Sequence, residues 1–412
     1  MYEITTFRVC GLFGQYDHSI DFRKNDVDSR SKARLCVIVG KNGVGKTTAL
    51  NMIEGILKLD FSIFREVPFS SAELTLSSED RLTVTSNLSS STLEVSFNDL
   101  FCSLSLKESG PANELCESGV EKLRQAALPK FTQVSFETLD IHRSSALRDR
   151  TNLKADEDID YLRTKSGKLI RGNKRNSKLT QKVHRFVREA QVDYRKYFTS
   201  EGPELFPKII KRLQGGEIND VTIEQLIDRL NVIKDSEPSM SRFGLSLNMS
   251  DIEQLTSLLS DKDSTKQSTA AISALEAYVE TLESKHAERL LISDRLIKFE
   301  KLVGEFLTDK VVAVDYQKGL TIYSAMGDEI DELMLSSGEY HLLYMLVTAL
   351  VSTRNGTAIA IDEPELSLHV SWQRKLVSAL IECSSGASPL FILATHSASI
   401  ASEHQDQWVQ LG

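Results

Sequence analysis

The feature that most constrains the fold is a glycine-rich segment near the N-terminus that ends in Gly-Lys-Thr. An apolar run at 35–39 precedes this segment, and residues 48–59 carry apolar side chains at helical spacing. A strand, a glycine loop and a helix N-terminus form an anion site, because the loop N–H groups point inward and the helix dipole favours negative charge. The segment fits the pattern G-x-x-x-x-G-K-T and consists of Gly40, Lys41, Asn42, Gly43, Val44, Gly45, Lys46 and Thr47.

The residue types in this loop predict separate roles toward ATP and Mg²⁺. We expect Lys46 to neutralise β- and γ-phosphate oxygens and the Thr47 hydroxyl to bind Mg²⁺. The other loop residues, together with Thr48 at the start of the helix, complete the predicted ATP-binding segment. The alternative interpretation is an accidental glycine turn, which the flanking strand and helix disfavour.

Composition limits the class of protein. The chain has 412 residues with 41% hydrophobic and 26% charged residues, typical of a soluble protein of two or three domains. We find no apolar run long enough for a membrane span and no N-terminal leader, so a cytoplasmic location is expected. The five cysteines show no metal-type spacing and suit a reducing compartment. A net charge of −9 argues against a globally basic nucleic-acid binder but permits a local basic patch.

The pattern outside the loop predicts an α/β fold whose middle is helical. Residues 2–23 predict a strand pair, and alternating segments within 72–97 predict an antiparallel meander with one wet face. Residues 103–129 are polar and weakly patterned, and Lys130–Ile141 predicts a strand. Helix formers dominate from about 155 to 312, which predicts a helical insertion, either a helical hairpin or a short coiled coil.

The C-terminal part returns to alternating strands and helices. A hairpin is expected over 311–323 and a helix buried on all sides over 342–351. Core strands are expected at 358–361 and 390–394, with an amphipathic helix at 372–383 between them. The predicted domains are an N-terminal lobe (1–150), the helical insertion (151–309) and a C-terminal lobe (310–412).

Two acids follow the first of these core strands. Asp362 and Glu363 are therefore expected at the C-terminal edge of a parallel sheet, where α/β proteins bind ligands. Asp362 would belong to the Mg²⁺ shell, and Glu363 would act as general base on the attacking water. A strand that ends in a solvated acidic turn is the alternative, and it weakens once a phosphate loop is present.

A serine-rich segment before the buried helix predicts a second anion site. Ser336 and Glu339 match the S-x-x-E capping box, so a helix starts here. The simple interpretation is a well-capped buried helix. The functional one is that Ser336, Ser337, Gly338 and Glu339 offer hydroxyls, N–H groups and a positive dipole end to a phosphate. Because Lys46 already serves the local phosphates, that phosphate would belong to a nucleotide on another subunit.

His396 stands at the end of the last core strand, 34 positions after Asp362. A lone histidine is more often structural than functional. This one is expected at the same sheet edge as the acids, where its imidazole can reach a γ-phosphate and report hydrolysis.

The order of these motifs resembles that of the ABC class of ATPases, in the branch with SMC, RecF and OLD-type proteins. The resemblance covers about 1–140 and 310–412 and leaves the helical middle unmatched. The matching segments are Gly40 to Thr47 (Walker A), Leu335 to Glu339 (signature), Ile361 to Pro364 (Walker B), Glu365 to His369 (D-loop) and Thr395 to Ser397 (H-loop).

The resemblance implies a P-loop NTPase head of ABC type that dimerises head-to-tail around two ATP molecules. Each Walker A would face the partner's signature, so Ser337 and Gly338 would act on the partner's nucleotide. The family usually has a glutamine that senses Mg²⁺ and the attacking water, and Gln133 is the candidate for it. Phe13 and Tyr16 are the candidates for stacking on adenine.

The sequence around Asp362 and His396 is also similar to that of compact ATPases of bacterial anti-phage defence, of the Septu and PARIS types. OLD-like relatives carry a following nuclease domain, whereas this chain ends sixteen residues after His396, so any effector is expected to be a separate protein. The leading hypothesis is an ATP-hydrolysing switch, a homodimer or higher oligomer, that controls a nuclease or toxin. The alternative is a RecF- or SMC-like DNA clamp. A transporter ATPase fits least, because the signature segment of this chain ends in Gly-Glu, whereas Gly-Gln is usual in transporters.

A basic stretch interrupts the acidic chain at 160–200. Aromatic residues are interleaved with the cations, and this mixture suits nucleic-acid binding. A solvated helical face, or a surface that docks an acidic partner, is the alternative. The cations are Arg163, Lys165, Lys168, Arg171, Lys174, Arg175, Lys178, Lys182, Arg185, Arg188, Arg195 and Lys196.

Overall fold

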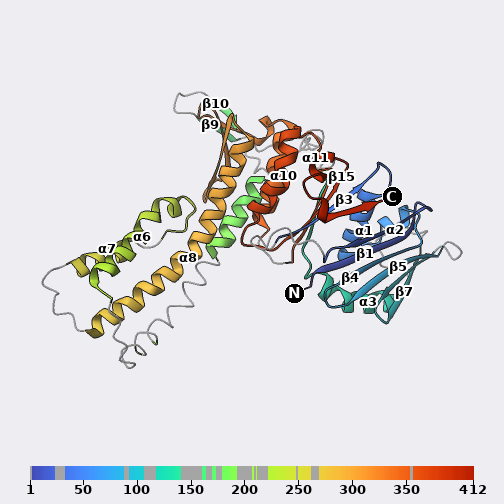
Figure 1. Cartoon of the computed structure of the whole chain (residues 1–412), viewed down its shortest axis with the longest axis horizontal. Coiled ribbons are helices and arrows are strands. Elements are labelled where there is room, and N and C mark those ends of the chain that lie inside the picture. Colours follow the sequence, from blue (N-terminus) through green and yellow to red (C-terminus); the bar gives the residue numbers. More distant parts are fainter. Residues whose placement is uncertain are drawn as a thin grey trace. The chain divides into compact units, whose positions relative to one another are not determined.

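The computed structural model forms two compact units (Figure 1). Unit 1 combines Met1–Glu157 with Leu335–Gly412, and unit 2 is Asp158–Met334. The division at residues 150 and 310 stays a prediction, and the contacts group the hairpin after residue 310 with unit 2. The residues that the structure describes are 2–23, 33–87, 92–105, 117–140, 160–163, 169–172, 179–192, 207, 210, 221–246, 249–260, 269–352 and 356–412.

A parallel sheet of five strands, in the order β16-β3-β15-β14-β8, is the centre of unit 1. Its pairings are parallel, so the carboxyl ends of the strands meet at one edge. Strands β14 and β15 are buried along their whole length, which explains why they read as continuous apolar runs. The strands are β3 (Arg34–Gly40), β8 (Phe136–Asp140), β14 (Ala358–Asp362), β15 (Leu390–Thr395) and β16 (Trp408–Leu411).

The second sheet of unit 1 is antiparallel and has the order β2-β1-β4-β5-β6-β7. Buried residues alternate with more exposed ones along β4, β5 and β6, which confirms the meander with one wet face. The strands are β1 (Ile4–Leu12), β2 (Tyr16–Asp21), β4 (Ser71–Leu76), β5 (Arg81–Asn87), β6 (Thr92–Phe97) and β7 (Leu100–Ser105).

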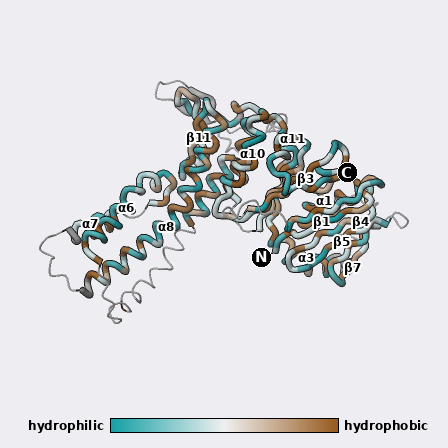
Figure 2. The backbone as a smooth tube through the Cα atoms, viewed as in Figure 1, coloured by the Kyte–Doolittle hydropathy of each residue, from teal (hydrophilic) through white to brown (hydrophobic). Residues whose placement is uncertain are grey.

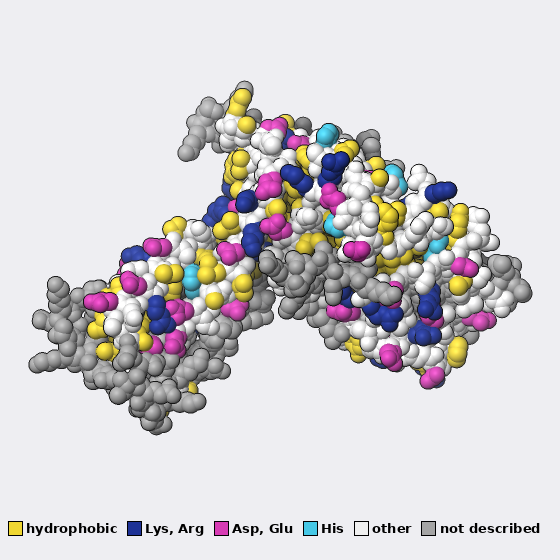
Figure 3. All heavy atoms as spheres, viewed as in Figure 1, with side chains coloured by type: hydrophobic (Ala, Val, Ile, Leu, Met, Phe, Trp, Pro, Cys, Tyr) yellow, Lys and Arg dark blue, Asp and Glu magenta, His cyan; other side chains and the backbone are white. Residues whose placement is uncertain are grey.

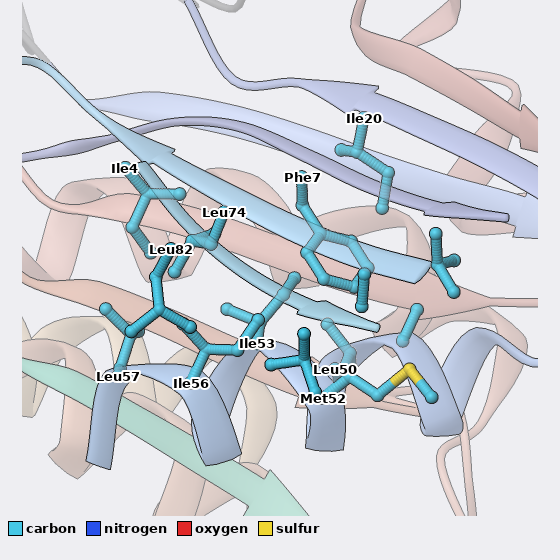
Figure 4. Close-up of a cluster of buried hydrophobic side chains, with 14 of the residues drawn as sticks. Ile4, Phe7, Ile20, Leu50, Met52, Ile53, Ile56, Leu57, Leu74 and Leu82 are labelled. Carbon is cyan, nitrogen blue, oxygen red and sulfur yellow. The ribbon is translucent and has the colours of Figure 1, made fainter. Parts of the chain in front are cut away.

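Helix α1 (Lys46–Lys58) packs against the buried face of this antiparallel sheet (Figure 4). Leu50, Ile53 and Ile56 of α1 lie in one apolar cluster with Phe7 and Leu74 of the sheet. Residues of β3, β14 and β15 belong to the same cluster, so α1 contacts both sheets. Each of these side chains contributes about 1.5–3 kcal/mol when fully buried. The helix that follows the glycine loop is thereby fixed from two sides.

The remaining helices of unit 1 include two that pack on each other, α9 (Ser337–Val351) and α10 (Val370–Cys383). Most residues of α9 are buried, as its apolar sequence predicts. The short elements are α2 (Ile63–Glu66), α11 (Ala398–Ala401) and η3 (Gln405–Gln407).

The segment after the meander differs from its prediction. Helix α3 (Glu117–Phe131) includes the first residues of the expected strand Lys130–Ile141, and β8 starts only at Phe136. Two contacts explain the difference. Phe131 packs edge-on against Phe97 with ring centroids 5.7 Å apart, and Lys130 pairs with Asp80 at 2.6 Å. These tertiary contacts outweigh the local preference for extended structure.

Unit 2 has a helical part in which α6 (Ile223–Arg242) packs against both α7 (Met249–Ser260) and α8 (Thr269–Phe306) (Figure 1). Ion pairs join Arg229 to Glu283 and Arg242 to Glu300. The partner's residue number on α8 increases as the residue number on α6 increases, so these two helices run parallel. Helix α7, which lies between them in the sequence, leads the chain back toward the start of α8. A single antiparallel hairpin therefore does not describe this part.

Hydrophobic and hydrophilic residues alternate along α8 (Figure 2), in keeping with one packed and one wet side. Unit 2 also contains the hairpin expected over 311–323, to which a third strand is added. A second, small hairpin was not expected from the sequence. These strands are β11 (Lys310–Asp315), β12 (Gly319–Ser324) and β13 (Glu329–Ile330), and β9 (Asp160–Arg163) with β10 (Leu169–Gly172). A 3-10 turn, η2 (Glu332–Met334), ends the unit. No helix in the described ranges has both the length and the apolar character of a membrane span.

Candidate functional site

The glycine loop curls between β3 and α1. Gly43 and Gly45 have φ values of +81° and +95°, in the left-handed region that favours glycine. A Cβ on Gly45 would lie 2.5 Å from Cδ2 of Leu12, so the loop packs tightly against β1. The loop conformation therefore depends on glycine at Gly45 for both backbone and packing reasons.

The start of α1 is suited to an anion. Helix α1 has neither a side-chain cap nor an acidic residue in its first turn, so no side chain of that kind competes for its positive end. Lys46 is buried, and its Nζ donates to the carbonyl oxygens of Gly40 (2.8 Å) and Lys41 (3.1 Å). An ammonium group and the helix N-terminus thus lie together at the mouth of the loop.

One hydrogen bond connects the loop to the other end of the chain. Thr47 Oγ1 donates to Asp362 Oδ2 at 2.6 Å, across 315 positions in sequence. Asp362 lies level with Ala394 of β15, and Thr395 lies level with Val39 of β3. The sheet register therefore places the ends of β3, β15 and β14 side by side, as the motifs predicted.

The next acid leaves the strand in an unusual conformation. Glu363 has φ +50°, a left-handed value that costs a non-glycine residue roughly 1–3 kcal/mol. Its N–H donates to the carbonyl of Ala394 at 2.8 Å, which holds this turn against β15. The Glu363 side chain is 27% exposed, and its Oε1 lies 3.9 Å from His396 Nδ1.

The nearer of the two acids recorded beside the His396 ring is one that the motifs did not single out. Glu365 Oε1 lies 3.1 Å from His396 Nδ1. The same carboxylate accepts hydrogen bonds from Thr395 Oγ1 (2.7 Å) and from the N–H groups of His396 (2.9 Å) and Ser397 (3.1 Å). In the sequence Glu365 appears only as the first residue of the expected D-loop, and nothing in its spacing marks this contact.

The serine-rich segment caps α9 as predicted. Ser336 Oγ accepts from the N–H of Glu339, and Glu339 Oε2 accepts from the N–H of Ser336. Ser336 and Ser337 are exposed. Gly338 lies against the D-loop, since a Cβ on it would be 2.3 Å from the carbonyl oxygen of Ser367. The signature segment and the D-loop therefore form one continuous surface.

Two weaker predictions concern aromatic residues near the loop. Phe13 is 38% exposed and adjoins the glycine loop, with its Cε2 3.3 Å from the position of a Cβ on Gly45. Tyr16 stacks on His18, and His18 Nε2 hydrogen-bonds the carbonyl of Val44 at 2.7 Å. Both residues therefore belong to the surroundings of the phosphate loop, and stacking on adenine stays a prediction for each.

Gln133 is wrongly placed for a residue that senses Mg²⁺. It lies in the turn before β8, whereas Asp140 at the other end of β8 is level with Asp362. The length of β8, roughly 16 Å at 3.3 Å per residue, separates Gln133 from the sheet edge that carries the acids. Gln133 is a candidate on the family resemblance alone, and its place at the opposite end of β8 from Asp362 does not suit that role.

A phosphate loop between β3 and α1, an antiparallel sheet on α1, and acids at the end of β14 together define a P-loop NTPase fold with an ABC-type head. The chain belongs to the AAA ATPase domain family, whose profile matches residues 3–401. The ATPase class expected from the motifs is thereby confirmed.

Comparison with solved structures gives Smc head domains as similar folds. One, from Pyrococcus furiosus, has an extended coiled coil and is bound to the C-terminal domain of ScpA. It shares 12% identity over 100% of this chain and 96% of that chain, with a TM-score of 0.38. Another, from Pyrococcus yayanosii, has a coiled coil and joint, 12% identity, coverage of 100% and 97%, and a TM-score of 0.40. No curated protein matches the sequence.

The contact between Gly338 and Ser367 gives a stability prediction. Gly338→Ala should lower the melting temperature by several degrees, because the added Cβ meets a backbone oxygen that cannot rotate away. Gly304→Ala is the matched control, since a Cβ on Gly304, within α8, meets nothing within 4 Å. The control should be neutral or slightly stabilising, by up to about 1 kcal/mol. Equal melting temperatures for the two variants would contradict the close contact.

Proposed function

We propose that the protein binds ATP with Mg²⁺ and hydrolyses it to ADP and phosphate. The observation that carries this proposal is the hydrogen bond between Thr47 and Asp362, which joins the phosphate loop to the acids at the end of β14. The residues present fit both groups. The uncapped start of α1 and Lys46 offer positive charge to phosphates, and the Thr47 hydroxyl with the Asp362 carboxylate offers the oxygen ligands that Mg²⁺ prefers.

The roles within the site follow from placement and exposure. Asp362 and Thr47 would hold Mg²⁺, which neutralises phosphate charge when bound. Glu363 is more exposed than Asp362 or Glu365, so it is the acid best placed to orient a water and accept its proton. His396 lies beside Glu363 and would contact the terminal phosphate.

Two copies are proposed to share their nucleotide sites. Ser336 and Ser337 are exposed at the capped start of α9, and Gly338 contacts the D-loop. A helix start that presents hydroxyls and N–H groups to solvent suits the phosphates of a nucleotide held by a second copy. Hydrolysis would then depend on a homodimer or a higher oligomer built from it.

The cellular role proposed for this ATPase is a cytoplasmic switch that controls a separate nuclease or toxin in anti-phage defence. Its support is the resemblance of the segments around Asp362 and His396 to compact defence ATPases. A shared-site dimer suits a switch, because ATP binding and hydrolysis change which surfaces the two copies present. An effector that binds only the ATP-bound dimer would be held until hydrolysis.

A DNA clamp is the second candidate, favoured by the basic stretch at 160–200. Its described part consists of β9, β10 and the helix at 179–192, and on that helix Arg185 and Arg188 are exposed. Most of the other cations have side chains outside the described residues. Among the aromatic residues interleaved with these cations, Phe186 is buried and has the Arg295 guanidinium 5.5 Å from its ring centroid, which does not suit stacking on bases. On the face of α6 to α8 seen in Figure 3, acidic and basic side chains are intermixed.

The chemistry is tested by two substitutions. Glu363→Gln should retain ATP binding and lose nearly all turnover, because the base is lost while the phosphate-binding groups remain. Lys46→Ala should weaken binding itself. Glu382→Gln, the same change at an exposed acid of α10, is the control and should hydrolyse ATP at the wild-type rate. Normal turnover by Glu363→Gln would show that Glu363 is not the base.

The shared site is tested by mixing two inactive proteins. Ser337→Arg blocks the signature surface and Lys46→Ala the phosphate loop, so each protein should be inactive alone. The mixture should regain part of the activity, because a heterodimer has one intact composite site. With subunit exchange demonstrated by a labelled copy, an inactive mixture would rule out the shared-site arrangement.

The two cellular roles are separated by charge reversal. If the protein is a clamp, duplex DNA should stimulate its ATPase, and Arg185→Glu with Arg188→Glu should reduce both DNA binding and its dependence on salt. Lys298→Glu with Lys301→Glu, at exposed positions on α8, is the control of equal charge. For a switch, DNA should leave ATP turnover unchanged and both double variants should behave alike.

A further inference from the structure

We propose that Glu365 is a positioning residue that fixes the proton on Nδ1 of His396 and so presents Nε2 to the nucleotide. This inference rests on the proposed ATP hydrolysis and assigns a role to an acid outside the motifs that predicted the site. Its starting observation is the contact of 3.1 Å between Glu365 Oε1 and His396 Nδ1.

The Glu365 carboxylate is buried and well supplied with donors. The residue is 8% exposed. Oε1 accepts from the N–H groups of His396 and Ser397 and lies 3.1 Å from Nδ1 of the ring, while Oε2 accepts from Thr395 Oγ1. Burial of a carboxylate is costly unless such hydrogen bonds compensate it. The backbone of the H-loop therefore folds around this carboxylate, which fixes the position of Oε1 relative to the ring.

The position of the carboxylate determines which ring nitrogen carries the proton. A carboxylate only accepts hydrogen bonds, so the ring nitrogen that faces Oε1 at this distance is the one that bears hydrogen. In the neutral ring Nε2 then has the lone pair. Glu363 Oε1 also lies on the Nδ1 side, at 3.9 Å, so two acids face Nδ1. The His396 side chain is 48% exposed, so about half of its surface is open to solvent or a bound group.

A second polar connection between the same loops does not contact the ring. Ser397 Oγ donates to Gln373 Oε1 at 2.8 Å, and Gln373 Nε2 donates to the carbonyl of Leu368 in the D-loop at 3.0 Å. Gln373 therefore contributes to how the loops are held, and none of its hydrogen bonds among the described residues reaches the His396 ring. It supplies a matched comparison for loss of loop support alone.

The test compares Glu365→Met with Gln373→Met in the full chain. Both substitutions remove a polar link between the D-loop and the H-loop, and only the first removes the acceptor of His396 Nδ1. We expect Glu365→Met to lower kcat by at least about 10-fold, because a misdirected group loses its reactive geometry, with the Kd for ATP nearly unchanged. Gln373→Met should lower the melting temperature and leave kcat within about 2-fold of wild type.

Two further measurements keep the role of Glu365 separate from general loss of structure. In His396→Ala, Glu365→Met should add less than about a 2-fold loss, since a residue that acts through the ring has nothing left to position. Nitrogen-15 spectra of labelled histidine, with His396 assigned by its absence in His396→Ala, should show the proton on Nδ1 in the wild-type protein. This spectrum needs no Glu365 variant and so holds even if Glu365→Met fails to fold.

The outcomes separate this inference from the proposed function. A wild-type His396 with its proton on Nε2 overturns the role of Glu365, as does Glu365→Met with normal kcat while His396→Ala is inactive. An equal loss of kcat in Glu365→Met and Gln373→Met also overturns it, because loop support would then explain both. If the wild-type protein hydrolyses no ATP, the proposed function itself fails, whichever ring nitrogen of His396 carries the proton.

Discussion

The hydrogen bond between Thr47 and Asp362 depends on the order of three parallel strands, β3-β15-β14. Thr47 lies in the first turn of the helix that follows β3, and Asp362 is the last residue of β14. They can meet because β15 lies between β3 and β14 in register. The sheet thereby brings two residues that are 315 positions apart in the sequence to the same edge. Closing so long a loop costs entropy that grows only slowly with length, so the buried strands can compensate it. In the sequence, the helical insertion therefore separates two segments that the sheet brings together at the candidate site.

The packing of α1 sets how firmly the phosphate loop is held. Apolar residues of α1 contact the antiparallel sheet and the parallel sheet in one cluster (Figure 4). The loop is attached to β3 at one end and to this helix at the other, and Gly45 packs against Leu12 between them. The backbone N–H groups are thereby preorganised, which spares a bound anion the cost of ordering them. A helix that packed on one sheet alone would leave the loop free to tilt.

Much of this arrangement could be predicted from the sequence, because strong local patterns carry it. The glycine loop, the capping box of Ser336 and Glu339 and the two buried strands all follow from spacing and residue type. The failures have a common cause, which is tertiary contact. Lys130 and Phe131 belong to α3 because of Asp80 and Phe97, and neither partner is visible in the local pattern. The parallel course of α6 and α8 likewise rests on contacts between distant positions, an apolar cluster shared by the two helices together with ion pairs.

Glu365 shows the same limit at the candidate site. Asp362 ends β14, and Glu363 and Glu365 follow it. Nothing in the local sequence pattern distinguishes the surroundings of these three acids. The structure sends them in different directions, since the left-handed turn at Glu363 and the proline after it redirect the chain. Asp362 accepts from Thr47, Glu365 is enclosed by donors from the H-loop, and Glu363 has the most exposed side chain of the three. One strand end thus provides three carboxylates whose environments differ, and this difference is what suits them to the separate roles proposed for them, as metal ligand, base and positioning residue.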